Sequence, residues 1–214
     1  LKRLHQNLGH PSNEDLARTL RLRGAKKHVQ VACRALRCAT CARHVRPKPP
    51  RPGRLGHVGD FNEMVYIDCL EIADAHGTKH MGRSIVDDAT TFHVVALLQN
   101  VSAAHLAEVF EESWLRWAGT PSSIIFDQQR GFGGRFREAL ERHGGILEIP
   151  IAGEAPWQLG RGEGHGGWWK ELARRTINHA NVIGAQEMRM CFAQAFGAKN
   201  ALRRRCGFSP AKWV

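Results

Sequence analysis

The sequence predicts an α/β protein, in which a mixed five-stranded sheet is covered by helices and preceded by a small basic module. Three observations support this prediction. Apolar runs typical of strands come first in the central region and then alternate with amphipathic helical segments. A Pro-rich stretch separates this region from the N-terminal residues. Those residues contain paired His and paired Cys, which indicate a unit stabilised by a metal rather than by a large core.

Charge is distributed unevenly along the 214 residues, whose formal net charge is +11. Residues 1–59 hold 14 Lys and Arg against 2 Asp and Glu, residues 60–169 hold 8 against 16, and residues 170–214 hold 9 against 2. Two basic flanks around an acidic centre favour binding of a nucleic acid, whose edges the flanks would hold while the acidic centre binds cations. The alternative is that the flanks only keep the chain soluble. No apolar stretch is long enough for a membrane span.

We expect three parts along the chain: a zinc-binding module at 1–46, a Pro/Arg-rich linker at 47–59 and a core at 60–214. The prolines of the linker favour an extended spacer, and its Lys and Arg residues are candidates for contacts with backbone phosphate. The chain begins at Leu1 rather than Met, so we expect it to be part of a longer polypeptide.

The N-terminal module predicts a zinc site. His5 and His10 are separated by four residues and Cys38 and Cys41 by two, with 27 residues between the pairs. Neutral imidazoles and thiolates are the ligands that tetrahedral zinc prefers, and a Cys-x-x-Cys turn can place both sulfurs on one ion. The alternative is that the histidines are surface residues and that the Cys-x-x-Cys spacing is coincidental. The competing ligands, which break the paired spacing, are His28, Cys33 and His44.

The core is predicted to contain five strands, at residues 63–72, 80–88, 91–98, 122–127 and 146–151. Helices are expected from Ser102 to a stop at Gly119, at 133–143, from the Gly-rich stretch 155–170 to about 183, and from about 185 to 204. In the module, Ser12 followed by Asp15 predicts the start of a further helix.

Three carboxylates in the core are candidates for a common site. Asp68 lies inside an apolar strand, where a charge is costly unless it is paired or bound to a metal. Asp127 ends a later strand, and Glu163 lies at the start of the helix that follows the Gly-rich stretch. Carboxylates on neighbouring elements can bind two divalent cations, one activating an oxygen nucleophile and one stabilising the leaving oxygen.

These features together resemble the integrases of retroviruses and LTR retrotransposons. The paired His and Cys are similar to the zinc-binding module of that family, and the segment 4–12 is similar to the retrotransposon version. Asp68, Asp127 and Glu163, with 35 residues between the last two, resemble the catalytic triad of the family. The segment 207–210 resembles the end of the core in retroelement Pol polyproteins. The resemblance therefore covers the whole chain.

The resemblance implies an RNase H-like core and a polynucleotidyl transferase. Such an enzyme trims the 3′ ends of element DNA with water and then joins those ends to target DNA by transesterification. In this interpretation Asp68 and Asp127 bind Mg²⁺ or Mn²⁺, Glu163 completes the two-metal site, and zinc binds the N-terminal ligands. The implied partners are element DNA, target DNA and further copies of the chain, with integration in the nucleus.

The resemblance also implies which basic residues contact DNA. Lys170 follows Glu163 by seven residues, or two helical turns, and would point at DNA phosphate from the same side of the helix. Arg161 and Arg174 are further candidates. The three glycines shortly after Glu163 each cost up to about 1 kcal/mol inside a helix, so we expect a loose turn there until metal or DNA orders it.

Two other functions are consistent with the sequence. A ribonuclease H would share the fold and the metals but would need a fourth carboxylate from the helix after the third strand, where the candidates are Glu108, Glu111 and Glu112. The other alternative is a DNA-binding module of retroelement origin that has lost its transfer activity. The zinc module and the carboxylate spacing argue against the first, and the three carboxylates argue against the second.

Overall fold

The structure is a computed structural model, which describes residues 1–43, 59–126, 134–144, 146–150, 160–203 and 207–214. The predicted linker at 47–59 lies almost wholly outside these ranges. None of the helices in the described part of the chain combines the length and the apolarity that a membrane crossing needs.

A mixed sheet forms the centre of the fold. Its strands are β1 (Met64–Ala73), β2 (Lys79–Asp87), β3 (His93–Leu98), β4 (Ser123–Phe126) and β5 (Leu147–Pro150). Their order in the sheet is β3-β2-β1-β4-β5. β1, β2 and β3 are antiparallel neighbours, whereas β4 is parallel to both β1 and β5. The predicted mixed sheet covered by helices is confirmed.

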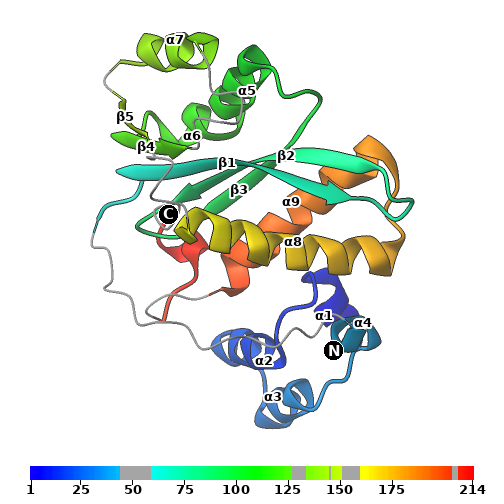
Figure 1. Cartoon of the computed structure of the whole chain (residues 1–214). Coiled ribbons are helices and arrows are strands. Elements are labelled where there is room, and N and C mark those ends of the chain that lie inside the picture. Colours follow the sequence, from blue (N-terminus) through cyan, green and yellow to red (C-terminus); the bar gives the residue numbers. More distant parts are fainter. Residues whose placement is uncertain (44–58, 127–133, 145, 151–159, 204–206) are drawn as a thin grey trace.

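Helices cover both faces of the sheet. One face carries α5 (Ala103–Phe110), the π-helical turn Glu111–Leu115, α6 (Arg116–Ala118) and α7 (Gly134–Arg142). The other carries α8 (Gly160–Ala180) and α9 (Gly184–Leu202), and the N-terminal module packs outside these two helices (Figure 1). A short 3₁₀ turn at Pro210–Lys212 follows.

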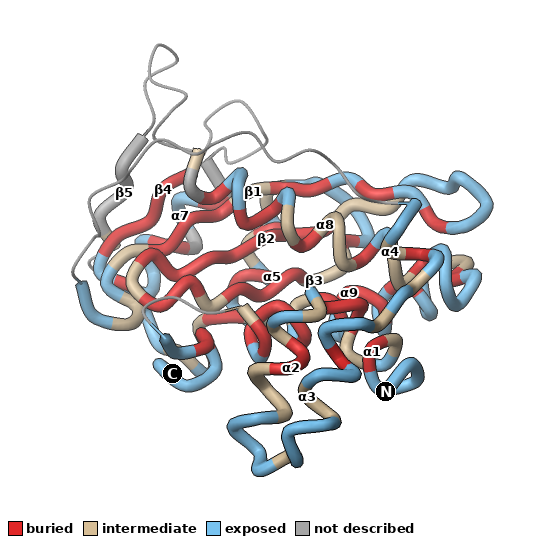
Figure 2. Tube along the Cα trace, turned by 90° about the horizontal axis from the view of Figure 1, so that it is seen from below, coloured by how far each residue is buried: buried red, intermediate tan, exposed pale blue. Residues whose placement is uncertain are grey.

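Side chains of β1 alternate between two cores, one on each face of the sheet. Ile67 and Cys69 belong to the cluster under α5 and α7, whereas Leu70 and Ile72 belong to the cluster under α8 and α9. A strand that is buried on both faces reads as a nearly continuous apolar run, which explains why the sequence indicates β1 clearly. Figure 2 shows that burial follows the strands, whereas α3 is largely exposed and α2 is mostly intermediate.

The sequence predicts one continuous helix from Ser102 to Gly119, and the structure differs from this prediction. Ser102 caps it as expected, because its side chain accepts a hydrogen bond from the His105 N–H at 3.3 Å. The π-helical turn Glu111–Leu115 then interrupts the α-helix and shifts the face of the residues that follow. Trp114 is fully buried, while Trp117 is 47% exposed, although the two rings still meet at a centroid distance of 5.2 Å.

The N-terminal module contains four short helices: α1 (Lys2–Asn7), α2 (Asn13–Leu22), α3 (Lys27–Arg34) and α4 (Ala39–Arg43). Ser12 begins α2 as predicted, and its Oγ accepts a hydrogen bond from the Asp15 N–H at 3.1 Å. The buried apolar residues of the module are Leu16, Ala17 and Cys33. Such a small core stabilises the module weakly, so a metal crosslink has much to contribute.

Asp74 ties the end of β1 to the connection between α8 and α9. Its Oδ1 accepts hydrogen bonds from the backbone N–H groups of His76 and Thr78 at 3.0 and 2.9 Å. Its Oδ2 lies 3.0 Å from Nε2 of His80 and accepts the Gly184 N–H at 3.1 Å. The bond to His80, followed by the bond from Gly184, holds the pKa of Asp74 well below its ordinary value. This network fixes where α8 ends relative to β1.

Candidate zinc and active sites

Four side chains of the N-terminal module converge on one point. Nε2 of His5 lies 3.2 Å from Sγ of Cys41, and Nδ1 of His10 lies 3.2 Å from Nε2 of His5. The same His10 nitrogen lies 3.3 Å from Sγ of Cys38 and 3.7 Å from Sγ of Cys41. One ligand atom from each residue lies within 4.8 Å of the other three. The structure therefore brings the four predicted ligands together.

The spacing of these atoms fits a tetrahedral zinc ion. Zinc–nitrogen bonds of about 2.0 Å and zinc–sulfur bonds of about 2.3 Å place tetrahedral ligands roughly 3.3–3.8 Å apart. The separations of 3.3 and 3.7 Å lie in that range, the separation of 3.2 Å lies just below it, and the four atoms lie within 4.8 Å of one another. Two imidazoles and two thiols suit zinc better than magnesium, which prefers oxygen ligands.

The pKa values of these ligands determine how zinc binding depends on pH. Burial lowers the pKa of His5, and the nearby positive charge of Arg175 lowers it further, so this imidazole is neutral as a metal ligand must be. Burial raises the pKa of the Cys41 thiol to about 11, and the neighbouring Cys38 adds to the rise. Zinc must displace the thiol protons, so zinc affinity is expected to fall as the pH falls.

Asp68 lies on the central strand β1, on the face of the sheet that α8 covers. Its side chain is half-buried, and Oδ1 accepts a hydrogen bond from the Cys69 N–H at 2.7 Å. Side chains two residues apart in a strand point to the same face, so Asp68 shares its face with Tyr66 and Leu70. Leu70 packs in the cluster under α8 and α9. The predicted position of Asp68 inside the first strand is confirmed.

Glu163 is exposed in the first turn of α8, which passes close to β1. A Cβ at Gly162 would lie 3.1 Å from Cβ of Tyr66, and one at Gly166 would lie 3.0 Å from a methyl group of Leu70. The two contacts fall on either side of Asp68 along β1, so the turn that carries Glu163 crosses the strand beside that carboxylate. These glycines therefore permit close packing, and the helix continues through the stretch that was expected to be loose.

Asp127 lies outside the described residues. Phe126 immediately precedes it and ends β4, where it pairs with Ile67 in the parallel ladder between β1 and β4. Ile67 in turn immediately precedes Asp68. Phe126 and Ile67 are both fully buried in the cluster under α5 and α7.

Two of the predicted DNA-binding residues lie on the same side of α8 as Glu163. At about 100° per residue, Lys170 and Arg174 fall within roughly 20° of Glu163 around the helix axis. Lys170 is half-buried and Arg174 is exposed. Nothing is described for the Arg161 side chain, although its backbone belongs to α8.

Sequence analysis did not predict that Arg175 contacts the candidate zinc site. Nη1 of Arg175 donates a hydrogen bond to the backbone carbonyl of His10 at 2.9 Å, and its Nη2 pairs with Glu171. The only local signal is the spacing of Glu171 and Arg175, since oppositely charged residues four apart in a helix attract each other. The contact with His10 joins residues 165 positions apart in sequence.

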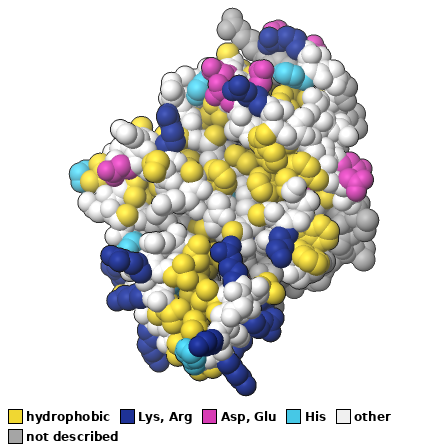
Figure 3. All heavy atoms as spheres, turned by 180° about the vertical axis from the view of Figure 1, so that it is seen from behind, with side chains coloured by type: hydrophobic (Ala, Val, Ile, Leu, Met, Phe, Trp, Pro, Cys, Tyr) yellow, Lys and Arg dark blue, Asp and Glu magenta, His cyan; other side chains and the backbone are white. Residues whose placement is uncertain are grey.

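Basic side chains are concentrated at one end of the molecule. Figure 3 shows Lys and Arg gathered over the lower end, where Figure 1 places the N-terminal module, and most of the visible acidic side chains in the upper half. This separation agrees with the uneven charge along the sequence and with a polyanion held at the basic end.

The structure is similar to solved structures of retroviral integrases. One is a chain of the simian T-cell lymphotropic virus intasome in complex with PP2A regulatory subunit B56 gamma: the TM-score is 0.69 at 15% identity, covering 99% of this chain and 70% of that one. Another is the HTLV-2 integrase catalytic core domain in complex with magnesium, in a dimeric form, with a TM-score of 0.60 at 16% identity, covering 71% of this chain and 95% of that one. Its trimeric form gives a TM-score of 0.59 at 15% identity, with the same coverage.

No protein-family model and no curated protein sequence matches the chain. At 15–16% identity the structural likeness establishes the fold: the core has the α/β architecture of retroviral integrase catalytic cores. The likeness to the intasome chain extends over 99% of the residues and therefore includes the N-terminal module.

Proposed function

We propose that this chain is an integrase-type polynucleotidyl transferase from a retroelement of the Pol-polyprotein type, with an RNase H-like core. Its substrates are the 3′ ends of element DNA and a target duplex. Asp68, Asp127 and Glu163 form the catalytic site, and the N-terminal His and Cys residues hold zinc. The proposal includes assembly into a homo-oligomer on DNA and integration in the nucleus.

The observation that carries the proposal is the arrangement around β1. Ile67 and Phe126 are paired in the parallel ladder, and the next residue on each chain segment is an aspartate. The first turn of α8 crosses β1 beside Asp68 and carries Glu163. This arrangement supports the convergence of three carboxylates, which are the ligands that Mg²⁺ prefers. The integrase core from HTLV-2 was solved with magnesium, which agrees with that choice.

The chemistry follows from the charge of the site. Divalent cations bound there would activate an oxygen nucleophile and stabilise the leaving 3′-oxygen. The three carboxylates hold and orient these cations, and Asp68 is fixed by its bond to the backbone of β1. Lys170 and Arg174, on the same side of α8 as Glu163, bind backbone phosphates and hold the DNA end near the carboxylates.

The direct test is a strand-transfer assay with Mg²⁺ or Mn²⁺ and paired DNA ends. Glu163→Gln and Asp68→Asn are expected to reduce joining by at least about a hundredfold, because metal-ion charge stabilisation is worth several kcal/mol of the barrier. The matched control is Glu138→Gln, which removes an exposed carboxylate from α7 on the other face of the sheet. Wild-type joining by Glu163→Gln would refute the assignment.

The same assay separates the two alternatives. Cleavage of an RNA–DNA hybrid without joining would indicate a ribonuclease H, whose fourth carboxylate would have to come from Glu108, Glu111 or Glu112. These residues are exposed on α5 and the π-helical turn, on the sheet face opposite α8, which favours the transferase. Binding of DNA with neither reaction would indicate a DNA-binding module without catalytic activity.

A further inference from the structure

The N-terminal module rests directly on the two helices that cover the functional face of the sheet. α4, which carries Cys41, packs against α8, and α2 packs against α9. The His10 and His179 rings meet edge to face, with centroids 5.4 Å apart. Gly9 lies so close to α9 that a Cβ there would be 3.2 Å from Cβ of Ala198. The contact therefore involves the segment that carries the second zinc ligand.

Arg175 makes the most direct connection between the zinc ligands and α8. Its Nη1 donates to the His10 carbonyl at 2.9 Å, while its Nη2 is held by Glu171 one helical turn earlier. Its side chain is only 14% exposed. His10 has a left-handed backbone conformation with φ 58°, which is uncommon for a residue with a side chain. A charged donor thus fixes a carbonyl in the turn that the zinc ligands require.

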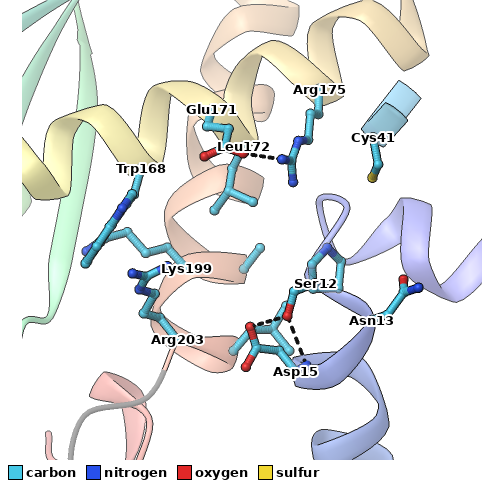
Figure 4. Close-up of a pocket in the computed structure, with 13 residues that line it drawn as sticks. Ser12, Asn13, Asp15, Cys41, Trp168, Glu171, Leu172, Arg175, Lys199 and Arg203 are labelled. Atoms are coloured by element: carbon cyan, nitrogen blue, oxygen red, sulfur yellow. Dashed lines mark hydrogen bonds and ion pairs between the residues drawn. The ribbon is translucent and has the colours of Figure 1, made fainter. Parts of the chain in front are cut away.

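A cavity of about 340 Å³ lies between the two parts (Figure 4). Its walls come from the module, from α8 and from α9, and Arg175 and Cys41 line the end of the cavity nearest the zinc ligands. Where an interface is hollow, the contacts that cross it account for a larger share of the coupling between its two sides. Arg175 is such a contact.

α8 continues from this interface to the candidate active site. Trp169, Ala173 and Ile177 are buried along its length, and its first turn packs on β1 through the glycines beside Glu163. A helix that is packed along one side transmits a constraint at one turn to the next, because its hydrogen bonds are continuous. What holds Arg175 therefore also restrains the turn that presents Glu163.

We propose that Arg175 is a positioning residue that couples zinc binding in the module to the order of α8. The inference rests on the zinc site of the proposed function but not on its DNA-joining activity. When zinc holds His10 in its turn, the carbonyl presented to Arg175 is fixed, and α8 gains an anchor outside the core. Linkage requires the reverse effect as well: the contact with α8 must strengthen zinc binding by the same factor.

The test is hydrogen exchange of the α8 amides in the full chain, with zinc and with chelator. In the wild type, zinc is expected to slow exchange around residues 168–180 by on the order of tenfold, a typical coupling between two sites. In Arg175→Ala this zinc-dependent slowing should fall below about twofold. Arg175→Lys keeps the charge but lacks the planar guanidinium that hydrogen-bonds to both His10 and Glu171. An intermediate zinc-dependent slowing is therefore expected. The control is Arg189→Ala, an exposed arginine on α9.

The outcomes separate coupling from a local stabilising role. If Arg175 only stabilises α8, Arg175→Ala will speed exchange equally with and without zinc, and the proposal fails. It also fails if the zinc-dependent slowing survives in Arg175→Ala or if zinc affinity is unchanged. Should Arg175→Ala lose the fold of the module, Arg175→Lys provides the same comparison. A wild type that binds no zinc would refute the zinc site itself. Neither the exchange measurement nor the zinc-binding measurement depends on strand-transfer activity.

Discussion

The N-terminal module and the core are stabilised in different ways. In residues 1–43 the hydrophobic cluster of the module buries only Leu16, Ala17 and Cys33, whereas the core buries large side chains on both faces of its sheet, among them Trp114, Trp169 and Phe126. Four ligand atoms gathered within 4.8 Å compensate for the small core of the module. We therefore expect a bound metal to stabilise the module, whereas apolar burial stabilises the core. Chelation should act mainly on the module, and core substitutions mainly on the core.

Removal of zinc is expected to give the largest effect, which should fall mainly on the module and reach the core through the contact of Arg175 with His10. Zinc contributes about 10–16 kcal/mol of apparent binding free energy in small zinc-dependent domains, so the module should lose its helices in chelator or in Cys38→Ser. The strands and α9 should keep their amide protection, because the core clusters contain none of the four candidate ligands, whereas α8 should lose protection around residues 168–180. Far-ultraviolet circular dichroism with and without chelator measures the change, and helicity that ignores chelator would contradict it.

Trp169→Ala should give the next largest effect, this time in the core. Trp169 is fully buried, and its ring meets that of Phe192 at a centroid distance of 4.6 Å. Truncation should cost about 3–5 kcal/mol of unfolding free energy, with or without zinc. Trp213→Ala is the control, because this side chain is 49% exposed and its loss should change stability by less than about 0.5 kcal/mol. Urea denaturation measures the unfolding free energy of both variants. Equal losses of stability would contradict the special role of the buried Trp169.

The core should also lose stability in mild acid because of His93. Burial lowers the pKa of His93 well below its ordinary value, and Lys199 and His165 lower it further. Nε2 of this neutral ring lies 2.8 Å from Oγ of Ser84. As the pH falls below the unfolded pKa of about 6.5, the unfolded chain takes up a proton that the folded core resists, so stability declines toward the folded pKa. Urea denaturation from pH 7.5 to 5 should show a shallower decline in His93→Gln, and an identical decline would contradict this role.

Glycine substitutions in α8 should give the smallest effects, and these should differ in sign. A Cβ at Gly164 meets nothing within 4 Å, so Gly164→Ala should stabilise the helix by up to about 1 kcal/mol. Gly162→Ala would press against Tyr66 at 3.1 Å and should displace the turn that carries Glu163. Thermal unfolding measures the stabilisation by Gly164→Ala, and the strand-transfer assay measures the effect of Gly162→Ala. A neutral Gly162→Ala in both assays would show that this close approach is not required.

Much of the structure of both the module and the core could be predicted from the sequence, because local sequence signals determine it. The caps at Ser12 and Ser102, the apolar strands and the spacing of the His and Cys pairs each reflect short-range physical chemistry. The predicted loose turn around Glu163 was wrong: helix propensity disfavours order among these glycines, and contact with Tyr66 and Leu70 explains it.

The remaining features depend on contacts between distant parts of the chain. The π-helical turn at Glu111–Leu115 has no sequence signature that periodicity can detect. Arg175 differs from its neighbour Arg174 only in which side of α8 it occupies, and its partner His10 lies 165 residues away. Docking of the module on α8 and α9 is what gives the two arginines separate roles.

The most direct test of the account is where a divalent cation binds the core. Crystals of the full chain grown with Mn²⁺ can be examined by anomalous diffraction, which locates manganese without reference to activity. We expect manganese to be bound by Asp68, Asp127 and Glu163 together, at oxygen distances of about 2.0–2.2 Å, and the site to be lost in Glu163→Gln. Manganese bound to Asp68 without Glu163, or bound equally well in Glu163→Gln, would contradict the shared site.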